Sequence, residues 1–458
     1  MQIAHKHYKT LGIIIVISTT LFTSMSCKKF LAEKPDASLT VPKTLTELEG
    51  LFNDAERMNF NLTPSMGESS ADDYFLLQET YDALPTQWQQ VYSWSLKEYR
   101  FQNDWSANYI PVYNANFALE SLSKIQRTAS NERQWDKVKG YSLFFRAYSF
   151  LNLVWIFSKA YDSSTASTDL GIVLRLGADF NQPSHRSSVE QTYHQIIKDT
   201  KEAANYLPEM SSNVLLPSKA ACYGLLSRTY LSTRQYDSAY KYSDLCIQLT
   251  DDILDYNTIP VTDEIPFPRL DNPETIFYSE MNTFNTNHYS FSGFVDSTLI
   301  RLYNANDLRL TAFFSPQNNL HRFKGAYTAN SILLFTGLAN DEIFLIRAEC
   351  SARKNMISGA MNDLNTLMKK RWNNDLPYLD FIAIDREHAI TQILAERRKE
   401  LLMRGIRWSD IKRLNKEGRE IIPKRLINGN EISLPSNNSR YALPIPADII
   451  SITGMPQN

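Results

Sequence analysis

The feature that most constrains this chain is a stripe of aromatic side chains between residues 135 and 157. Large apolar residues recur there at steps of three and four, which is the spacing of one helix face: Tyr141, Phe144, Phe145, Tyr148, Leu151 and Trp155. A stripe of this kind lies in a protein core far more often than in a cofactor pocket, so it has to be covered by other elements. The chain has more Tyr (24) and Phe (23) than Gly (15), which favours packed helices over a turn-rich β-sandwich.

The helices predicted around this stripe come in pairs. Ser218 is a suitable cap for a helix over 219–232, and a partner helix follows over 237–250. This pair is similar to a tetratricopeptide hairpin, whose motif positions are occupied by Tyr223, Leu226, Ser227, Tyr230, Ala239 and Ser243. The same spacing recurs in 340–371, where Ala348 and Ala360 would let two helices approach closely. The predicted helices 105–126 and 135–157 form another pair, and such pairs bury their faces by stacking.

Other segments complete a fold prediction that is mainly α. Further helices are expected over 45–58, over 189–207 with Ser188 as the cap, and over 385–403. Residues 61–104 and 251–335 break the helical pattern and are expected to be long loops with short helices and a few short β-strands. Residues 158–187 are predicted to be a loop, and the proline-bearing stretch from Tyr441 an extended tail. The helical scaffold therefore covers approximately 105–250 and 340–371.

The N-terminal segment has the pattern of an export signal. A basic start precedes an apolar run from Leu11 to Phe22, which is too short to span a bilayer as a helix. Ser24-Met-Ser-Cys27 then resembles a lipobox, in which Cys27 is lipidated, with palmitate among its acyl chains, and anchors the protein to a membrane. The alternative is an ordinary secretory signal that happens to precede a cysteine. We predict a cleaved signal peptide over 1–26, a lipidated tether over 27–44 and one domain over 45–458.

Cysteine content and charge exclude several classes of protein. Three cysteines remain after Cys27, and an odd number without a CxxC pair argues against a disulfide scaffold. Buried free thiols are expected at Cys222, Cys246 and Cys350, and a Cys222–Cys246 bridge is the alternative. The 48 basic and 50 acidic residues give no global field that would attract nucleic acid.

A dense set of charges occupies 396–413. Its members fall at helical spacing: Glu396, Arg397, Glu400, Arg407 and Asp410. Arginine forks and carboxylates arranged in this way form structural ion-pair networks more often than active sites. We therefore interpret the set as part of the fold and not as a ligand site.

Several segments together resemble the SusD/RagB family of outer-membrane lipoproteins. They occur in the family's order along the chain: the start at Cys27-Lys-Lys-Phe-Leu, then Arg146-Ala-Tyr-Ser-Phe-Leu, Leu226-Ser-Arg-Thr-Tyr-Leu, Arg347-Ala-Glu, the charged helix from Glu396 to Arg413, and Leu443-Pro-Ile-Pro near the end. One departure is Arg404 before Gly405, where many members have an acid.

This resemblance implies a fold and a function. The fold would be a SusD-like, right-handed tetratricopeptide-type helical scaffold with loop-rich insertions. The protein would be anchored by lipid in the outer membrane, facing outward, and would capture an oligosaccharide or a similar nutrient for a SusC-like TonB-dependent transporter. Lys28 and Lys29 stand where the family's export signal usually carries acids, so surface exposure is implied by kinship alone. A peptide ligand fits the family as well.

Aromatic and polar side chains on the two loop-rich stretches are the candidate ligand residues. Sugar C–H groups pack on aromatic rings while hydroxyls bind amides and carboxylates, and loops on a rigid scaffold commonly carry such groups. The first stretch offers Asp72, Asp73, Tyr74, Trp88, Tyr92 and Trp94, and the second offers Asn285, His288, Tyr289 and Phe291, with Arg322 and Tyr327 as further candidates. The alternative is that half of these aromatics only close the loops onto the helices.

Two rival functions stay open. A surface enzyme of the glycoside hydrolase type would need only two carboxylates, which no sequence pattern excludes. The chain contains no HExxH, GxSxG, Walker A or GxGxxG motif, and its histidines lack metal-ligand spacing. A peptide-binding scaffold is the second rival, because tetratricopeptide arrays often bind peptides. We predict no catalytic residue, no metal site and no cofactor.

Overall fold

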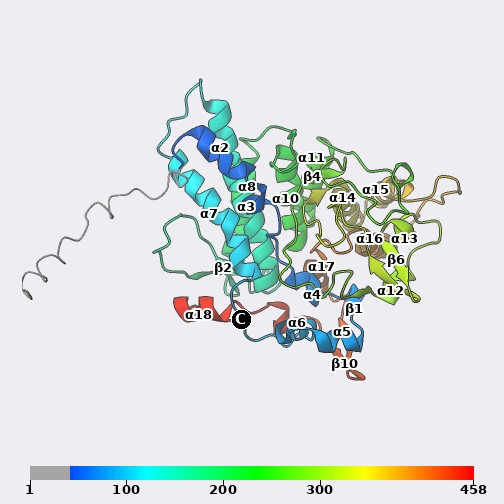
Figure 1. The fold of residues 1–458 in the computed structure, drawn as a ribbon. Coiled ribbons are helices and arrows are strands. Elements are labelled where there is room, and N and C mark those ends of the chain that lie inside the picture. The colour runs from blue at the N-terminus through cyan, green and yellow to red at the C-terminus, as the bar shows by residue number, and fades with distance from the viewer. Residues whose placement is uncertain (1–41) are drawn as a thin grey trace, which may run out of the picture. The chain divides into compact units, whose positions relative to one another are not determined.

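The structure is a computed structural model that describes residues 42–458, of which Thr44–Asn458 form one unit. The predicted signal peptide, Cys27 and most of the tether lie outside the described residues. The unit is mainly helical, as predicted (Figure 1). Its longer helices are α2 (Leu45–Asn53), α7 (Asp104–Leu122), α8 (Glu132–Phe157), α9 (Val189–Ala203), α10 (Lys219–Ser232), α11 (Tyr236–Ile247), α14 (Asn340–Arg353), α15 (Ile357–Lys369), α16 (Arg386–Glu400) and α17 (Arg407–Asn415).

Short helices and two-stranded sheets occupy the segments between them. The helices are α3 (Ala55–Met58), α4 (Met66–Ser70), α5 (Gln78–Ala83), α6 (Thr86–Tyr92), α12 (Ser297–Ile300), α13 (Arg309–Ala312) and α18 (Ala447–Thr453). The sheets are antiparallel pairs: β1 (Tyr74–Phe75) with β5 (Phe294–Val295), β2 (Leu170–Val173) with β3 (Arg186–Ser188), β4 (Thr275–Phe277) with β8 (Leu338–Ala339), β6 (Phe314–Gln317) with β7 (Leu320–Phe323), and β9 (Lys424–Ile427) with β10 (Asn430–Ser433). No helix within 42–458 is long and apolar enough to cross a membrane.

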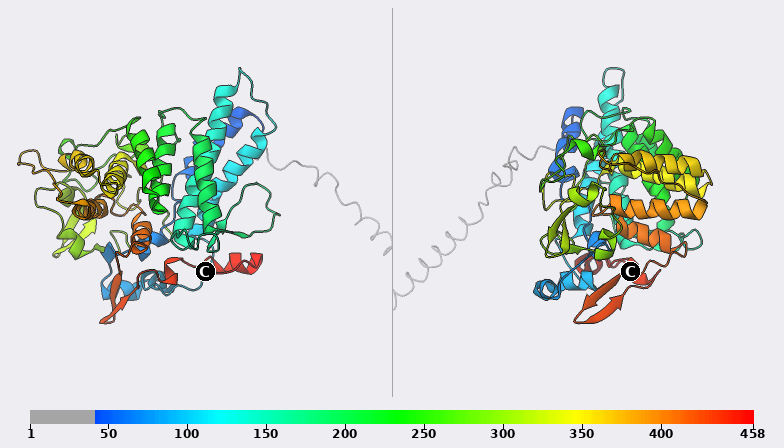
Figure 2. Two further views of the ribbon diagram at one scale, coloured as in Figure 1. Left: turned by 180° about the vertical axis from the view of Figure 1, so that it is seen from behind. Right: turned by 90° about the vertical axis from the view of Figure 1, so that its right-hand side faces the viewer.

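The helices pack as consecutive pairs. Helices α7 and α8, α8 and α9, α10 and α11, and α14 and α15 are neighbours, and α11 also packs on α14. In Figure 2 the cyan, green and yellow helices follow one another in chain order across the unit. Close approach depends on small residues: a Cβ on Gly140 of α8 would lie 2.5 Å from Leu207 Cδ2, and Ala348 and Ala360 are fully buried between α14 and α15. The predicted stacking of helix pairs is therefore confirmed.

Helix caps explain why the predicted boundaries hold. The Ser188 hydroxyl accepts from the Gln191 amide at 3.1 Å in a capping box, and Ser218 accepts from the Ala221 amide at 3.2 Å. Asp385 likewise caps α16 through the His388 amide at 2.8 Å. Each cap satisfies an amide that the first helical turn leaves without a partner.

Four parts of the fold differ from the prediction. The single helix expected over 45–58 is broken at Asp54 into α2 and α3. The hairpin of β9 and β10 was not expected, and the expected loop over 158–187 contains the sheet of β2 and β3. The expected extended tail includes α18, so that prediction is wrong for Ala447–Thr453. Cys222, Cys246 and Cys350 are free and buried, which excludes the alternative of a Cys222–Cys246 bridge.

Candidate ligand-binding face and the buried charge network

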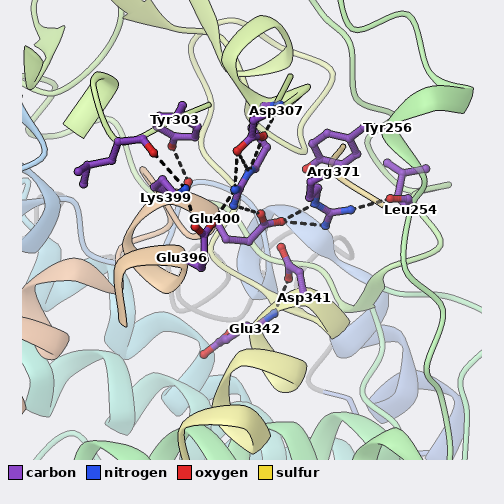
Figure 3. A network of polar contacts seen from close by, with 12 residues as sticks. Leu254, Tyr256, Tyr303, Asp307, Asp341, Glu342, Arg371, Glu396, Lys399 and Glu400 are labelled. Carbon is purple, nitrogen blue, oxygen red and sulfur yellow. Dashed lines mark hydrogen bonds and ion pairs between the residues drawn. The ribbon is translucent and has the colours of Figure 1, made fainter. Parts of the chain in front are cut away.

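A buried network of charges joins the loop-rich segment to the helices (Figure 3). Arg309 contacts Asp307 and two carboxylates of α16, those of Glu396 at 2.7 Å and Glu400 at 2.8 Å. Arg371, just after α15, contacts Glu400 at 2.8 Å and Glu274 at 2.6 Å. Each arginine thus has at least two carboxylate partners in the interior.

Burial and pairing set the protonation of this network. Burial alone would raise the pKa of Glu400, but the guanidinium groups of Arg371 and Arg309 outweigh it and lower that pKa. Glu274 shares Arg371 with Glu400, and burial raises its pKa against the opposing effect of Arg371. The network therefore has a structural role, in which each buried arginine is compensated by more than one carboxylate.

The charged set predicted over 396–413 has the structural role that we inferred. Arg397 donates to Asp410 at 2.8 Å, and Arg413 donates to Glu349 at 2.7 Å. Arg404, the departure from the family pattern, contacts Asp341 at 2.6 Å. All of these side chains are buried, which excludes them from direct contact with a large ligand.

The two aspartates predicted as ligand residues are also engaged by this part of the chain. Asp72 accepts from Arg407 at 2.6 and 2.8 Å, and Asp73 accepts from Arg398 at 2.7 Å. Burial would raise the pKa of Asp72, but Arg407 and Arg398 hold it well below its usual range. Both carboxylates anchor the loop after α4 to α16 and α17.

The aromatic side chains of the first stretch divide into buried and partly exposed groups. Tyr74, Tyr92 and Trp94 are buried around the guanidinium of Arg425, whose carbon lies 4.9, 4.4 and 5.2 Å from the three ring centres. Their polar atoms are used internally, since Trp94 Nε1 donates to the Ser70 carbonyl at 2.9 Å. These three rings close the loop onto the scaffold, as the alternative from the sequence describes. Trp88 on α6 stays partly exposed.

The second stretch meets the first in space. Strand β5 pairs with β1, the Asn287 amide donates to the Trp88 carbonyl at 2.9 Å, and His288 Nδ1 lies 2.8 Å from Ser69 Oγ. Asn285, His288 and Tyr289 are buried, and burial lowers the pKa of His288 to about 3. Phe291 is 56% exposed, so its ring faces solvent at the edge of this junction. Of the two further candidates, Tyr327 is buried and Arg322 lies over the Phe294 ring at 3.9 Å.

Four consecutive residues at this junction have buried polar atoms without a hydrogen-bond partner among the described residues. They are Asn285 Oδ1, Thr286 Oγ1, Asn287 Oδ1 and His288 Nε2. Buried polar atoms are nearly always paired in folded proteins, so a run of four is a feature of this loop that needs an explanation. We define the junction face as this run together with Trp88 and Phe291.

The space beside this run is small. The pocket bounded by His288, Ser290, Lys324 and Asn330 has a volume of about 10 Å³, so no sugar ring fits inside it. A ligand at the junction face would therefore lie across the surface, against Trp88 and Phe291. Sequence reasoning missed Thr286 and Asn287, although the run of polar residues from Asn285 was a signal, and it missed Arg425, for which no local signal exists.

Within 42–458 no group of three or more His, Cys, Asp or Glu side chains is arranged to hold a metal ion. Trp94 borders a larger pocket of about 260 Å³ that is also lined by Lys97, Arg440 and Gln457. The lining of this pocket combines an aromatic ring with cationic and amide side chains.

Comparisons with known families agree with this fold. Residues 29–231 match a family model described as starch-binding and associating with the outer membrane, and residues 341–458 match the model of the SusD family. The two matches together cover more than half of the chain. A search of curated proteins finds no match.

Solved structures are similar over nearly the whole chain. A protein from Bacteroides vulgatus described as a putative sugar binding protein has a TM-score of 0.74 at 18% identity, covering 92% of this chain and 99% of its own. A SusD superfamily protein from Bacteroides thetaiotaomicron has a TM-score of 0.72 at 18% identity, covering 91% and 99%. A SusD-like carbohydrate binding protein from Bacteroides vulgatus has a TM-score of 0.68 at 18% identity, covering 90% and 97%. At this identity the likeness shows a shared fold.

Proposed function

The chain belongs to the SusD/RagB family, and on that premise we propose that it captures an oligosaccharide at the outer membrane for a SusC-like TonB-dependent transporter. In this proposal Cys27 carries the lipid anchor and the binding domain faces outward. The protein binds its ligand and breaks no bond, so uptake is its whole activity.

The observation that carries the ligand site is the pair of accessible rings, Trp88 and Phe291, beside a run of unpaired polar atoms at the junction face. The unpaired polar atoms of Asn285 to His288 are buried beneath this surface, where an ordered water could satisfy them and link them to a sugar hydroxyl. The exposed ring of Phe291 and the partly exposed ring of Trp88 supply the flat apolar surfaces on which sugar C–H groups pack. Two segments far apart in sequence thus bring ring surfaces and polar groups together at one face, which is the combination that carbohydrate binding requires.

The direct test is calorimetric titration of the mature protein with maltoheptaose, xylohexaose and a panel of other neutral oligosaccharides. For a ligand that binds, Trp88→Ala and Phe291→Ala should each weaken binding at least fivefold while the melting temperature stays within about 2 °C, since neither ring is fully buried. Phe180→Ala is the matched control, because Phe180 is 78% exposed on the loop between β2 and β3. Equal weakening by all three variants, or by none, would remove the junction face as the site.

Trp94 is a poor probe for the same purpose. Its ring is buried and packed against Arg425, so Trp94→Ala would weaken binding by unfolding the loop. Trp88 and Phe291 avoid this confusion, because each ring is at least partly exposed and its loss should weaken binding without unfolding the loop.

The transporter and the anchor require a separate experiment in membranes of the producing bacterium. An affinity tag inserted at Asn428–Gly429, the exposed turn between β9 and β10, leaves Asn458 free to keep its hydrogen bonds to the Phe157 and Leu443 carbonyls. A β-barrel partner should be recovered with the tagged protein, and Cys27→Ala should release the protein from the membrane fraction. Recovery of an unacylated protein without a barrel partner would contradict both parts of the proposal.

A further inference from the structure

A polar pocket lies beside the C-terminal end of α8, away from the run of unpaired atoms at the junction face. The loop over 159–169, helix α17 and the segment 437–441 enclose about 320 Å³, a volume within the range of small-molecule sites. Five charged residues are part of its lining: Lys159, Asp162, Asp169, Lys412 and Lys416.

Two of the three lysines are neutralised by the two aspartates. Lys159 Nζ lies 2.7 Å from Asp169 Oδ1, and Lys416 Nζ lies 3.1 Å from Asp162 Oδ2. The remaining carboxylate oxygens also have partners, since Thr165 donates to Asp169 at 2.6 Å and Ser164 to Asp162 at 2.7 Å. Neither aspartate is left to compensate the third lysine.

Lys412 is that third lysine, and it is 6% exposed. Its ammonium donates to the carbonyls of Trp155 at 2.7 Å and Ser158 at 2.5 Å, and no carboxylate of the described residues lies within 4 Å of it. An ammonium has three N–H donors, so one is left for a partner in the pocket. The carbonyls at the end of α8 offset part of the charge through the helix dipole and do not neutralise it.

Other buried cations show how unusual this arrangement is. Within 42–458, every buried arginine or lysine except Lys412 and Arg425 contacts a carboxylate within 4 Å. Arg425 is enclosed by the rings of Tyr74, Tyr92 and Trp94 and donates to the Ala71 and Tyr74 carbonyls. Of Lys412 and Arg425, Lys412 is the one that lines the pocket described above.

The mouth of the pocket offers further donors. Asn438 Nδ2 and Ser439 Oγ border it, and neither forms a hydrogen bond with a described residue, although Asn438 Oδ1 accepts from Arg440. Such groups can bind the hydroxyls of a sugar whose charged group is held deeper by Lys412.

We propose that this pocket binds the carboxylate of an acidic sugar residue, held by the Lys412 ammonium. This proposal rests on the proposed function and adds a class of ligand to it, the acidic sugars. Binding of the carboxylate at Lys412 does not require the junction face. The carboxylate completes the coordination of a buried cation, and the ring hydroxyls bind Asn438 and Ser439.

The pH dependence of binding provides an independent readout. Burial lowers the pKa of Lys412 to about 7, so the ammonium form increases as pH falls through 7. The other titratable groups that face the pocket keep their charge across this pH range. Asp162 and Asp169 have lowered pKa values and stay ionised, and each remains paired with its lysine. The pKa of Tyr441 is raised, so its hydroxyl stays neutral. Affinity for a carboxylate should therefore increase up to about tenfold between pH 8 and pH 6.

The test is titration of the mature protein with D-glucuronate, with D-glucose as the neutral counterpart and sulfate as a free anion. Glucuronate should bind at least tenfold more tightly than glucose at pH 6, and Lys412→Met should abolish this preference. Ser439→Trp, at an exposed position, should block the pocket without altering the core. Lys370→Met removes a lysine that is paired with Asp255 and does not line the pocket, and it is the matched control.

Each outcome decides the proposal. Equal binding of glucuronate and glucose would overturn it, as would unchanged glucuronate affinity in both Lys412→Met and Ser439→Trp. Binding of sulfate without binding of glucuronate would overturn the assignment to a sugar. A negative result for this pocket can be distinguished from a negative result for the proposed function. Binding of neutral oligosaccharides is tested with the Trp88 and Phe291 variants, and Lys412→Met should leave that binding unchanged.

Discussion

The Arg309–Arg371 network and the Lys412 pocket both hold buried cations, and they compensate the charge by different means. Arg309 and Arg371 lie among Asp307, Glu274, Glu396 and Glu400, and their side chains are inaccessible to solvent. Lys412 has two backbone carbonyls and a pocket instead. The network ties three segments of the chain together, whereas the pocket leaves one face of its cation without a protein partner.

The difference separates charges that specify the fold from a charge that is available to a ligand. A buried charge with complete pairing is a poor site, because a ligand would have to displace its partners. A buried charge with incomplete pairing responds by shifting its pKa, as Lys412 does, and gains a partner when an anion binds. Selective loss of either arrangement tests this distinction.

The largest effect is expected from breaking the network at Arg371. Arg371→Met leaves Glu274 and Glu400 buried without their shared partner, which should lower the free energy of unfolding by about 3–5 kcal/mol. Arg386→Met is the matched control: its exposed pair with Glu387 at 3.4 Å should contribute less than about 1 kcal/mol. Chemical denaturation of both variants measures the difference. Similar losses of stability in the two variants would mean that the buried network does not stabilise the packing of the loops on the helices.

A smaller effect is expected at Glu68, the acidic counterpart of Lys412. Glu68 Oε2 accepts from the Gly405 amide at 2.8 Å, and Oε1 has no partner among the described residues. Burial raises its pKa to about 8. The folded protein therefore holds a proton that the unfolded chain releases, so this stability is fully present below about pH 4.5 and is lost as pH rises through 8.

Glu68→Gln should remove this pH dependence. The amide is neutral at every pH and keeps an oxygen for the Gly405 amide, so the variant should be more stable than the wild type at pH 8 by about 3–4 kcal/mol and about equal to it at pH 5. Unfolding by denaturant at the two pH values measures this. Glu79→Gln, an exposed residue on α5, should run parallel to the wild type. A constant offset of the Glu68 variant at both pH values would show that the carboxyl is ionised throughout.

The helical part was predictable because its signals are local. Ser188, Ser218 and Asp385 cap their helices through atoms three residues away, so the sequence alone contains both partners. The missed elements also have local signals that were outweighed. Pro446 suggested an extended tail but stands at the cap of α18, where proline is compatible with the start of a helix, and Asn428-Gly429 is a typical hairpin turn between β9 and β10.

The candidate ligand face was predictable only in part, because burial depends on distant contacts. Tyr74, Tyr92 and Trp94 are covered by Arg425, which follows them by more than 300 residues, and no periodicity within 61–104 indicates this. Trp88 and Phe291 are not covered in this way, and they remain predicted ligand residues. The pairing of β1 with β5, which brings both loops together, is equally non-local.

Lys412→Met should have a smaller effect on stability than Arg371→Met, because no buried carboxylate loses its partner. The variant loses two hydrogen bonds to carbonyls, a loss of about 1–2 kcal/mol at pH 7. The wild-type lysine, with a folded pKa of about 7, binds fewer protons than in the unfolded chain between pH 7 and 10.5, so its contribution rises with pH across that window. Denaturation at pH 7 and 9 should show a slope that the variant lacks, and an equal slope in both would contradict the assignment.

The smallest effect is expected at the buried thiols, which avoid a buried charge by staying neutral. Burial raises the pKa of Cys222 and raises that of Cys246 to about 12, and Cys246 Sγ donates to the Ala220 carbonyl at 3.3 Å. Thiolates are the reactive form, so native protein made without Cys27 should not react with a thiol-specific disulfide reagent until it unfolds. A reducing agent should shift the melting temperature by less than about 1 °C, because no bridge exists to be broken. Rapid labelling of the folded protein would show that the helices around these cysteines open in solution. A clear loss of stability on reduction would show that a disulfide is present. Either result would contradict the assignment of buried, neutral thiols.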